Sequence, residues 1–183
     1  MQSFFTQNQI EQIISFASEA GEIALDFFKS KDFSINKKQD GSEVTSADIA
    51  VSKLLRQKLA KEFPQIPIIC EEGDLREVEG DVFFLIDPID GTSAFIAGKT
   101  EFAINIALIK DKKAIFGLIY APLFQGGRMV FSNHEDQVIL WSNLSSDKSE
   151  KILQSTKIQQ KDHLNIVLSP RSKESDVVNY IAQ

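Results

Sequence analysis

The sequence predicts an α+β fold in which helices cover one face of a largely antiparallel sheet. The first third of the chain carries two stretches in which apolar residues recur every three or four positions, the spacing of amphipathic helices. Short apolar stretches separated by turns follow, and consecutive strands joined in this way pair antiparallel. With 183 residues, 43% of them hydrophobic, the chain can form one substantial domain or one and a half.

Both predicted helices have a typical first residue. Thr6 followed by Gln9 fits a capping box, and the helix behind it ends near Ser30. The second helix begins at Thr45, and its pattern ends before Pro64, which cannot continue a helix. The residues predicted to face the core are Ile10, Ile13, Ile14, Ala17, Ala20, Ala24, Phe27 and Phe28, then Ala47, Val51, Leu54, Leu55 and Leu59.

The strands are predicted in consecutive pairs. Residues 31–44 should form a short extended piece followed by a turn at Asp40 and Gly41. The turn at Asp111 and Lys112 should close a tight hairpin. The strands predicted after the second helix span 66–70, 83–86, 102–109, 113–120, 128–131 and 137–141.

The last part of the chain differs from the first in composition. Residues 142–162 are polar and are predicted to be a connector with one strand, before a strand at 164–168 and a helix at 173–182. One strand and one helix cannot bury a core alone. We therefore expect a first α+β domain at 1–145, and at 146–183 a connector and the start of a truncated second domain.

Composition excludes several functions. A net charge of −6 without a basic run argues against binding a nucleic-acid polymer. No stretch approaches the roughly 20 apolar residues of a membrane span. The single cysteine, Cys70, excludes an internal disulfide, and the start of the chain does not resemble a signal peptide. We expect a cytoplasmic protein that does not bind membranes.

Three carboxylates are predicted to meet where two strands end. Glu71 follows one strand and Asp87 the next, and Asp90 lies one tight turn further on. Pro88 removes an N–H that would face a cation, which leaves carbonyl oxygens such as that of Ile89 free. Oxygen ligands suit hard divalent cations such as Mg²⁺, and the absence of His and Cys from this set disfavours zinc.

A predicted helix start lies directly behind these acids. Gly91 and Thr92 would present unpaired N–H groups and the positive helix end, a seat for phosphate. A bound Mg²⁺ could polarise a phosphate ester there, with Thr92 orienting a water. Two alternatives stay open from the residues alone: Asp87 and Asp90 could merely cap this helix, and Asp48 could merely complement the dipole of the second helix.

Three motifs resemble the signature of the inositol monophosphatase superfamily, which comprises magnesium-dependent phosphomonoesterases. They are VTSAD at 44–48, ICEEGD at 69–74 and DPIDGTSAF at 87–95, in the expected order. The resemblance implies the layered αβαβα sugar-phosphatase fold and two or three Mg²⁺ ions. It implies metal ligation by Glu71, Asp87, Asp90 and the Ile89 carbonyl, phosphate binding by the amides of Gly91 and Thr92, water activation by Thr92 with Asp48 and Glu71, and an outer metal-site role for Lys38.

Sequence outside these motifs bears on the substrate. EFAINIALI at 101–109, GLIYAP at 117–122 and SPRSKES at 169–175 resemble the 3′(2′),5′-bisphosphate nucleotidases, which convert 3′-phosphoadenosine 5′-phosphate to AMP. Ser93-Ala94 departs from the Lys-Glu usual there and from the Thr-Asn of inositol monophosphatases. Inositol monophosphatase and histidinol phosphatase activities are the alternatives, and a small phosphorylated substrate is expected in each case.

The resemblance also has a gap. The superfamily carries a further metal-ligand Asp in a W-D-x-A-A/G motif, whereas here Trp141 is followed by Ser142. We therefore expect an incomplete second metal site, and an alternative of another class is a truncated, non-catalytic remnant that binds metal or phosphate. The sheet face that meets the second domain in the family should be apolar and exposed, which favours a homodimer.

Overall fold

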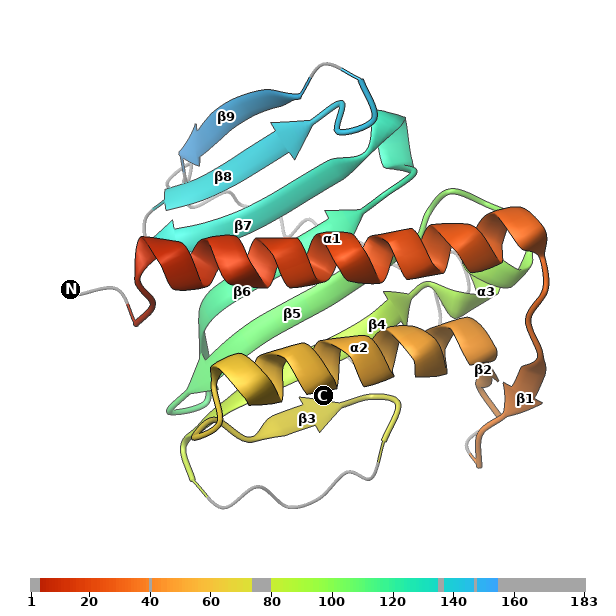
Figure 1. The fold of residues 1–183 in the computed structure, drawn as a ribbon, viewed down its shortest axis with the longest axis horizontal. Coiled ribbons are helices and arrows are strands. Elements are labelled where there is room, and N and C mark those ends of the chain that lie inside the picture. The colour runs from red at the N-terminus through yellow and green to blue at the C-terminus, as the bar shows by residue number, and fades with distance from the viewer. Residues whose placement is uncertain (1–3, 40, 74–79, 135–136, 147, 155–183) are drawn as a thin grey trace, which may run out of the picture.

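The structure, a computed structural model, describes residues 4–39, 41–73, 80–134, 137–146 and 148–154. It has the predicted α+β fold, with α1 and α2 lying across the same face of a sheet (Figure 1). Three helices are described: α1 (Gln7–Ser30), α2 (Ser46–Glu62) and α3 (Thr92–Ile96), with a 3₁₀ turn at Phe124–Gly126. The strands are β1 (Ile35–Lys37), β2 (Glu43–Thr45), β3 (Ile68–Cys70), β4 (Val82–Asp90), β5 (Ala103–Lys110), β6 (Lys113–Ala121), β7 (Arg128–His134), β8 (Gln137–Ser142) and β9 (Ser149–Gln154).

Two sheets are formed. β1 and β2 make a separate antiparallel hairpin, and the other seven strands lie in sequence order from β3 to β9. β3 and β4 run parallel, and every later pair is antiparallel. The predicted hairpin turn is confirmed at Asp111 and Lys112, which have φ of 50° and 62°. Two positive φ values are what a two-residue turn with the twist of a hairpin requires.

The helices begin where capping chemistry predicts. Thr6 and Gln9 form the expected capping box, and α1 ends at Ser30. Thr45 caps α2 in the same way, with Asp48 as its partner. Most of the predicted core-facing residues of both helices are buried, although Phe27, Phe28 and Leu54 are only partly so. Gly21 brings α1 close to the sheet, since a Cβ there would lie 2.3 Å from Tyr120 Cε1.

The predicted limits of three strands need correction. β3 begins at Ile68, two residues after the predicted start at Ile66. β4 does not end at Ile86 but continues to Asp90, with its register against β5 shifted between Asp87 and Asp90. β7 extends three residues beyond the predicted Phe131, to His134. The strand expected within 142–162 is β9, which pairs with β8 and continues the main sheet. The strand predicted at 164–168 and the helix at 173–182 lie outside the described residues, so the division at residue 145 stays a prediction.

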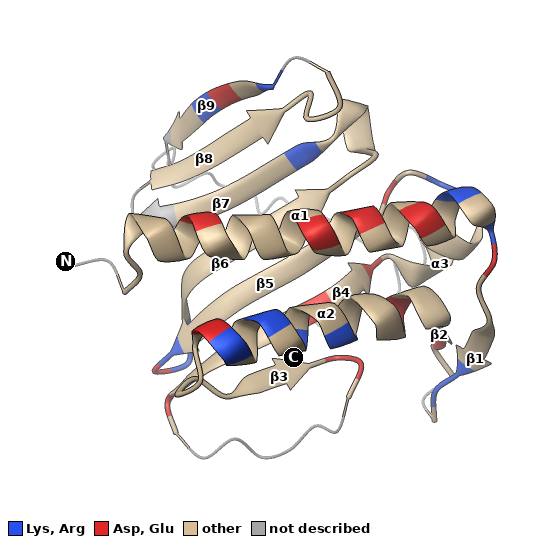
Figure 2. Ribbon diagram, in the orientation of Figure 1, with Lys and Arg blue, Asp and Glu red and all other residues tan. Residues whose placement is uncertain are grey.

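The two faces of the sheet differ in character. Charged side chains lie along α1 and α2, which cover one face, whereas the strands behind them are mostly uncharged (Figure 2). On the sheet itself a groove of about 560 Å³ is lined by Ile69, Leu85, Ala107, Gly117 and Ile119 and reaches Glu71 and Asp87. Leu85 and Ile119, on this apolar part of the sheet, are 44% and 52% exposed within the part of the chain that the structure describes. Among the described residues, no helix is long and apolar enough to cross a membrane.

Candidate functional site

Asp48 lies buried at the start of α2. Its Oδ2 accepts hydrogen bonds from the backbone N–H of Thr45 at 2.8 Å and from the Thr45 hydroxyl at 2.5 Å. Both side chains are 1% exposed. Burial raises the pKa of Asp48 above its ordinary value, against the lowering effect of these hydrogen bonds. The acid therefore does more than complement the helix dipole, because its second oxygen faces another element.

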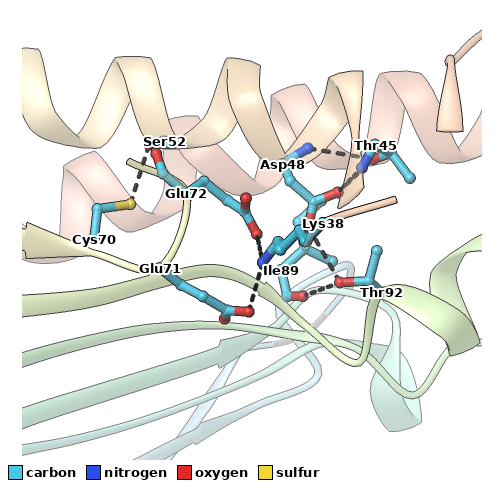
Figure 3. Close-up of polar contacts among 9 residues, drawn as sticks. All are labelled: Lys38, Thr45, Asp48, Ser52, Cys70, Glu71, Glu72, Ile89 and Thr92. Carbon is cyan, nitrogen blue, oxygen red and sulfur yellow. Dashed lines mark hydrogen bonds and ion pairs between the residues drawn. The ribbon is translucent and has the colours of Figure 1, made fainter. Parts of the chain in front are cut away.

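That second oxygen contacts Thr92, at the start of α3. The Thr92 hydroxyl lies 3.3 Å from Asp48 Oδ1 and 3.0 Å from the carbonyl oxygen of Ile89, and donates to both (Figure 3). Its single proton is thus shared between two protein acceptors. The lone pairs of the Thr92 oxygen remain available to accept a hydrogen bond from a ligand or water. We call Thr45, Asp48 and Thr92 the hydroxyl cluster.

The end of β4 is a strand with a bulge instead of the predicted turn. Pro88 lies within the stretch where the register shifts, a position at which proline is tolerated because it needs no ladder hydrogen bond. Pro88 and Ile89 are both buried, so the inward–outward alternation of the strand breaks there. Asp90 is exposed, and its Oδ2 accepts a hydrogen bond from Asn105 Nδ2 at 3.1 Å. Three steps along β4 here match two along β5, so the bulge brings Asp87 and Asp90 to the same face of the sheet.

Asp87 lies among other carboxylates at the end of β4. Burial raises its pKa to about 7, and the charge of Glu71 and a hydrogen bond with that residue add to the shift. The charges of Asp90 and Asp48 act in the same direction. Burial and the neighbouring carboxylates together raise the pKa of Asp87, and a cation bound beside it would be stabilised by those carboxylates.

Lys38 supplies a cation near this place. Its ammonium nitrogen lies 2.9 Å from Glu71 Oε1 and 2.5 Å from Glu72 Oε1 (Figure 3). Burial alone would lower the pKa of Lys38, but its hydrogen bonds to the two carboxylates raise it. Burial raises the pKa of Glu72 despite the lysine. Lys38, Glu71 and Glu72 form what we call the charged cluster.

Glu72 is a site residue that the sequence reasoning omitted. The two adjacent acids at 71 and 72 indicate an acidic site after the strand. A single sequence does not show which of the two side chains is buried. In the structure the Glu72 side chain is 7% exposed and the Glu71 side chain 53%. The Glu72 carbonyl also accepts a hydrogen bond from Ser52, a buried residue of α2.

The donor set suits a hard cation in its chemistry, since every predicted ligand is an oxygen. The positions of these side chains do not yet form a complete metal site. Among the described residues, no group of three His, Cys, Asp or Glu side chains is placed to hold a metal ion. Glu71 and Asp87 approach each other, but Glu71 is engaged by Lys38 and Asp90 by Asn105. The metal roles predicted for these residues and for Ile89 therefore stay predictions.

A polar cavity adjoins the start of α3. It has a volume of about 340 Å³ and is lined by residues of the β1–β2 hairpin, by Glu71 and by Gly91, Thr92 and Ser93. Gly91 has φ of 90°, and a Cβ there would lie 2.8 Å from the carbonyl oxygen of Glu101. The backbone can therefore pass this point only with glycine. The predicted phosphate residues thus line a cavity large enough for a phosphate group.

Comparison with known proteins identifies related chains. The sequence profile of the inositol monophosphatase family matches residues 6–181. The 3′(2′),5′-bisphosphate nucleotidase CysQ of Aggregatibacter actinomycetemcomitans is 37% identical over 122 residues, which cover 64% of this chain and 45% of that protein. CysQ of Buchnera aphidicola is 28% identical over 179 residues, which cover 96% of this chain and 64% of that protein. The chain thus spans about half to two thirds of the length of these relatives.

Solved structures share the fold. CysQ from Bacteroides thetaiotaomicron, described as a bacterial member of the inositol monophosphatase family, gives a TM-score of 0.65 at 23% identity and covers 97% of this chain and 68% of its own. An IMPase from Thermotoga maritima gives a TM-score of 0.65 at 23% identity, with 73% of this chain and 51% of its own covered. At this identity the likeness supports the predicted fold and not a substrate.

Proposed function

Because this chain belongs to the inositol monophosphatase family, we propose that it carries the metal- and phosphate-binding centre of a Mg²⁺-dependent phosphomonoesterase. The observation that carries the proposal is the contact of Thr92 with both Asp48 and the Ile89 carbonyl. It joins α2, β4 and α3 at the side of a polar cavity that also contains Glu71.

The carboxylates of Glu71, Asp87 and Asp90 and the carbonyl of Ile89 would hold the cation. Bound there, Mg²⁺ would polarise the phosphate ester and lower the pKa of a water. Burial and the charges of neighbouring acids raise the pKa of Asp87. A divalent cation bound there would offset the negative charge, so the cation-bound site is favoured over the empty one. Glu71 and Asp90 must first exchange their present contacts with Lys38 and Asn105.

Thr92 would orient the attacking water. Its hydroxyl proton is directed to Asp48 and Ile89, so its oxygen can accept a hydrogen bond from the water and direct a lone pair of the water toward phosphorus. Asp48 keeps the hydroxyl in that orientation, and Thr45 keeps Asp48 in place. The amide groups of Gly91 and Thr92 would bind phosphate oxygens from the wall of the cavity.

For the substrate we propose a 3′(2′),5′-bisphosphate nucleotide, with AMP and phosphate as products of 3′-phosphoadenosine 5′-phosphate. A relative with that activity in its name is 37% identical to this chain over 122 residues. The IMPase structure from Thermotoga maritima is 23% identical to this chain and supports the fold alone. Inositol phosphates are therefore the second candidate.

A non-catalytic role is the candidate of another class. Lys38 lies on a predicted metal ligand, and the described residues contain no formed metal group. A protein that binds phosphate or metal without turnover would show both features. The assay that follows separates the two functions.

The test is phosphate release from 3′-phosphoadenosine 5′-phosphate and inositol 1-phosphate, with Mg²⁺ and with chelator. We expect release only with Mg²⁺ and faster from the nucleotide, and a loss of about 100-fold or more in Thr92→Val, which keeps the shape of the side chain. Ile96→Val, a conservative change on the same helix at a residue that does not line the cavity, is the control for α3. Absence of release from every phosphomonoester by the folded protein would reject the enzyme and favour the binding role.

A further inference from the structure

The charged cluster places a protein cation on a predicted metal ligand. Lys38 contacts Glu71 and Glu72 at 2.9 Å and 2.5 Å, and its own side chain is 23% exposed. In a partly buried pair the attraction between charges is stronger than in bulk water. The ammonium therefore supplies one positive charge at the position where the proposed cation would supply two.

Lys38 also lies in the turn of the β1–β2 hairpin. Its N–H donates to the carbonyl of Ser42 at 2.8 Å, and its own carbonyl accepts from Gly41 at 3.0 Å. The three residues of β1 are exposed, and the hairpin forms no ladder with the main sheet. The Lys38 side chain thus ties the turn of this hairpin to the end of β3, across 33 residues of sequence.

We propose that Lys38 is a tethered competitor of the divalent cation, which displaces its ammonium from Glu71 and so releases the turn of the β1–β2 hairpin. The inference rests on the proposed metal site. A fixed ammonium within a few ångströms of a divalent cation repels it, so the bound state favours a displaced lysine. The two equilibria are linked. The factor by which the cation weakens the Lys38 contact with Glu71 is also the factor by which that contact weakens cation binding.

The released hairpin would change the cavity beside it. Lys37, Ser42 and Glu43 line the same 340 Å³ cavity as Gly91 and Thr92. Movement of the hairpin turn would therefore alter the wall opposite the proposed phosphate seat. Cation binding and access to that seat become coupled through one side chain.

Calorimetric titration of the metal-free protein with Mg²⁺ tests the inference without an activity measurement. Lys38→Met should bind Mg²⁺ about tenfold more tightly than the unchanged chain, because the competitor is gone. Lys38→Arg keeps a cation within reach of the two acids and should stay near the unchanged affinity. Lys53→Met removes an equal charge from an exposed position on α2 and is the control for net charge.

A second readout follows the hairpin itself. Mg²⁺ should speed amide hydrogen exchange of residues 36–39 and 41–43 in the unchanged chain, and this acceleration should vanish in Lys38→Met, whose hairpin turn is already released. Equal or weaker Mg²⁺ binding by folded Lys38→Met would overturn the competitor role and leave the metal site standing. Failure of both proteins to bind Mg²⁺ would overturn the metal site and the competitor together.

Discussion

The hydroxyl cluster and the charged cluster lie close together (Figure 3) but are held in different ways. Thr45 and Asp48 are 1% exposed and are hydrogen-bonded to each other in the cap of α2. The Thr92 hydroxyl donates a further hydrogen bond to Asp48. In the charged cluster Glu71 is 53% exposed and depends on a lysine from a separate hairpin. The first group is fixed by local geometry, whereas the second can exchange its cation.

This difference suits the two tasks that the proposed reaction requires. A residue that orients water must keep one position, and the partly buried Thr92 hydroxyl is held by two acceptors, Asp48 and the Ile89 carbonyl. Metal ligands must accept and release an ion, and a partly exposed set with a replaceable counter-charge permits that. We expect substitutions in the hydroxyl cluster to affect stability most and those in the charged cluster to affect ion binding most.

Asp48→Ala should have the largest effect. It removes the acceptor for both Thr45 donors and for Thr92 and leaves buried polar groups unpaired, at a cost of about 2–3 kcal/mol in the free energy of unfolding. Urea unfolding measures the change, with Asp32→Ala, an exposed acid between α1 and β1, as the control. A loss no larger than that of the control would show that the cluster does not stabilise the junction.

Gly91→Ala should have the next largest effect. Its φ of 90° strains any other residue, and the added Cβ would lie 2.8 Å from a backbone oxygen, so we expect a loss of about 1–3 kcal/mol. Gly41 has a similar φ of 84°, but nothing lies within 4 Å of an added Cβ. Gly41→Ala should therefore lose only the stability that the positive φ costs. Equal losses in the two variants, measured by thermal unfolding, would contradict the close approach at Gly91.

The charged surroundings of Asp87 predict a pH effect in chelator. Its pKa of about 7 in the folded protein exceeds the ordinary 3.8, so the folded state holds a proton that the unfolded state has lost between these values. This group should make the metal-free protein less stable as pH rises from about 4 to about 7, and Mg²⁺ should reverse the loss at pH 7. Asp87→Asn should flatten the profile. An equally steep profile in that variant would assign the effect to other groups.

The smallest expected effect concerns the apolar groove that ends at Glu71 and Asp87. Leu85→Ser and Ile119→Ser replace its two most exposed apolar side chains. If the chain associates through this face, sedimentation should show the dimer of the unchanged chain shifting to monomer, with little change in unfolding. A monomer in every case would contradict the predicted homodimer.

The sequence predicts the hydroxyl cluster better than the charged one. Thr6, Thr45 and the turn at Asp111 follow local rules of capping and turn geometry, which act over three or four residues. Motif spacing alone left Asp48 as a dipole partner. The family resemblance paired Asp48 with Thr92, and the two side chains are in contact, while their shared role in water activation stays a prediction. Local chemistry and a known motif together thus account for most of the fold and for this half of the site.

The remaining features depend on contacts between distant segments. Nothing near residue 38 indicates that its side chain reaches Glu71 and Glu72, because that contact depends on where the hairpin lies. The continuation of β4 past Pro88 was missed because proline normally ends a strand, whereas a bulge accommodates it here. Such outcomes follow from sheet register and packing, which a single sequence does not specify.

A crystal structure of the protein grown with Mn²⁺, whose anomalous signal locates the ion, tests the central claim most directly. We predict a metal between Glu71 and Asp87, with the Lys38 ammonium withdrawn from its 2.9 Å contact with Glu71 and with Thr92 still bonded to Asp48. A metal bound elsewhere, or a metal at Glu71 with Lys38 still in contact, would contradict the account.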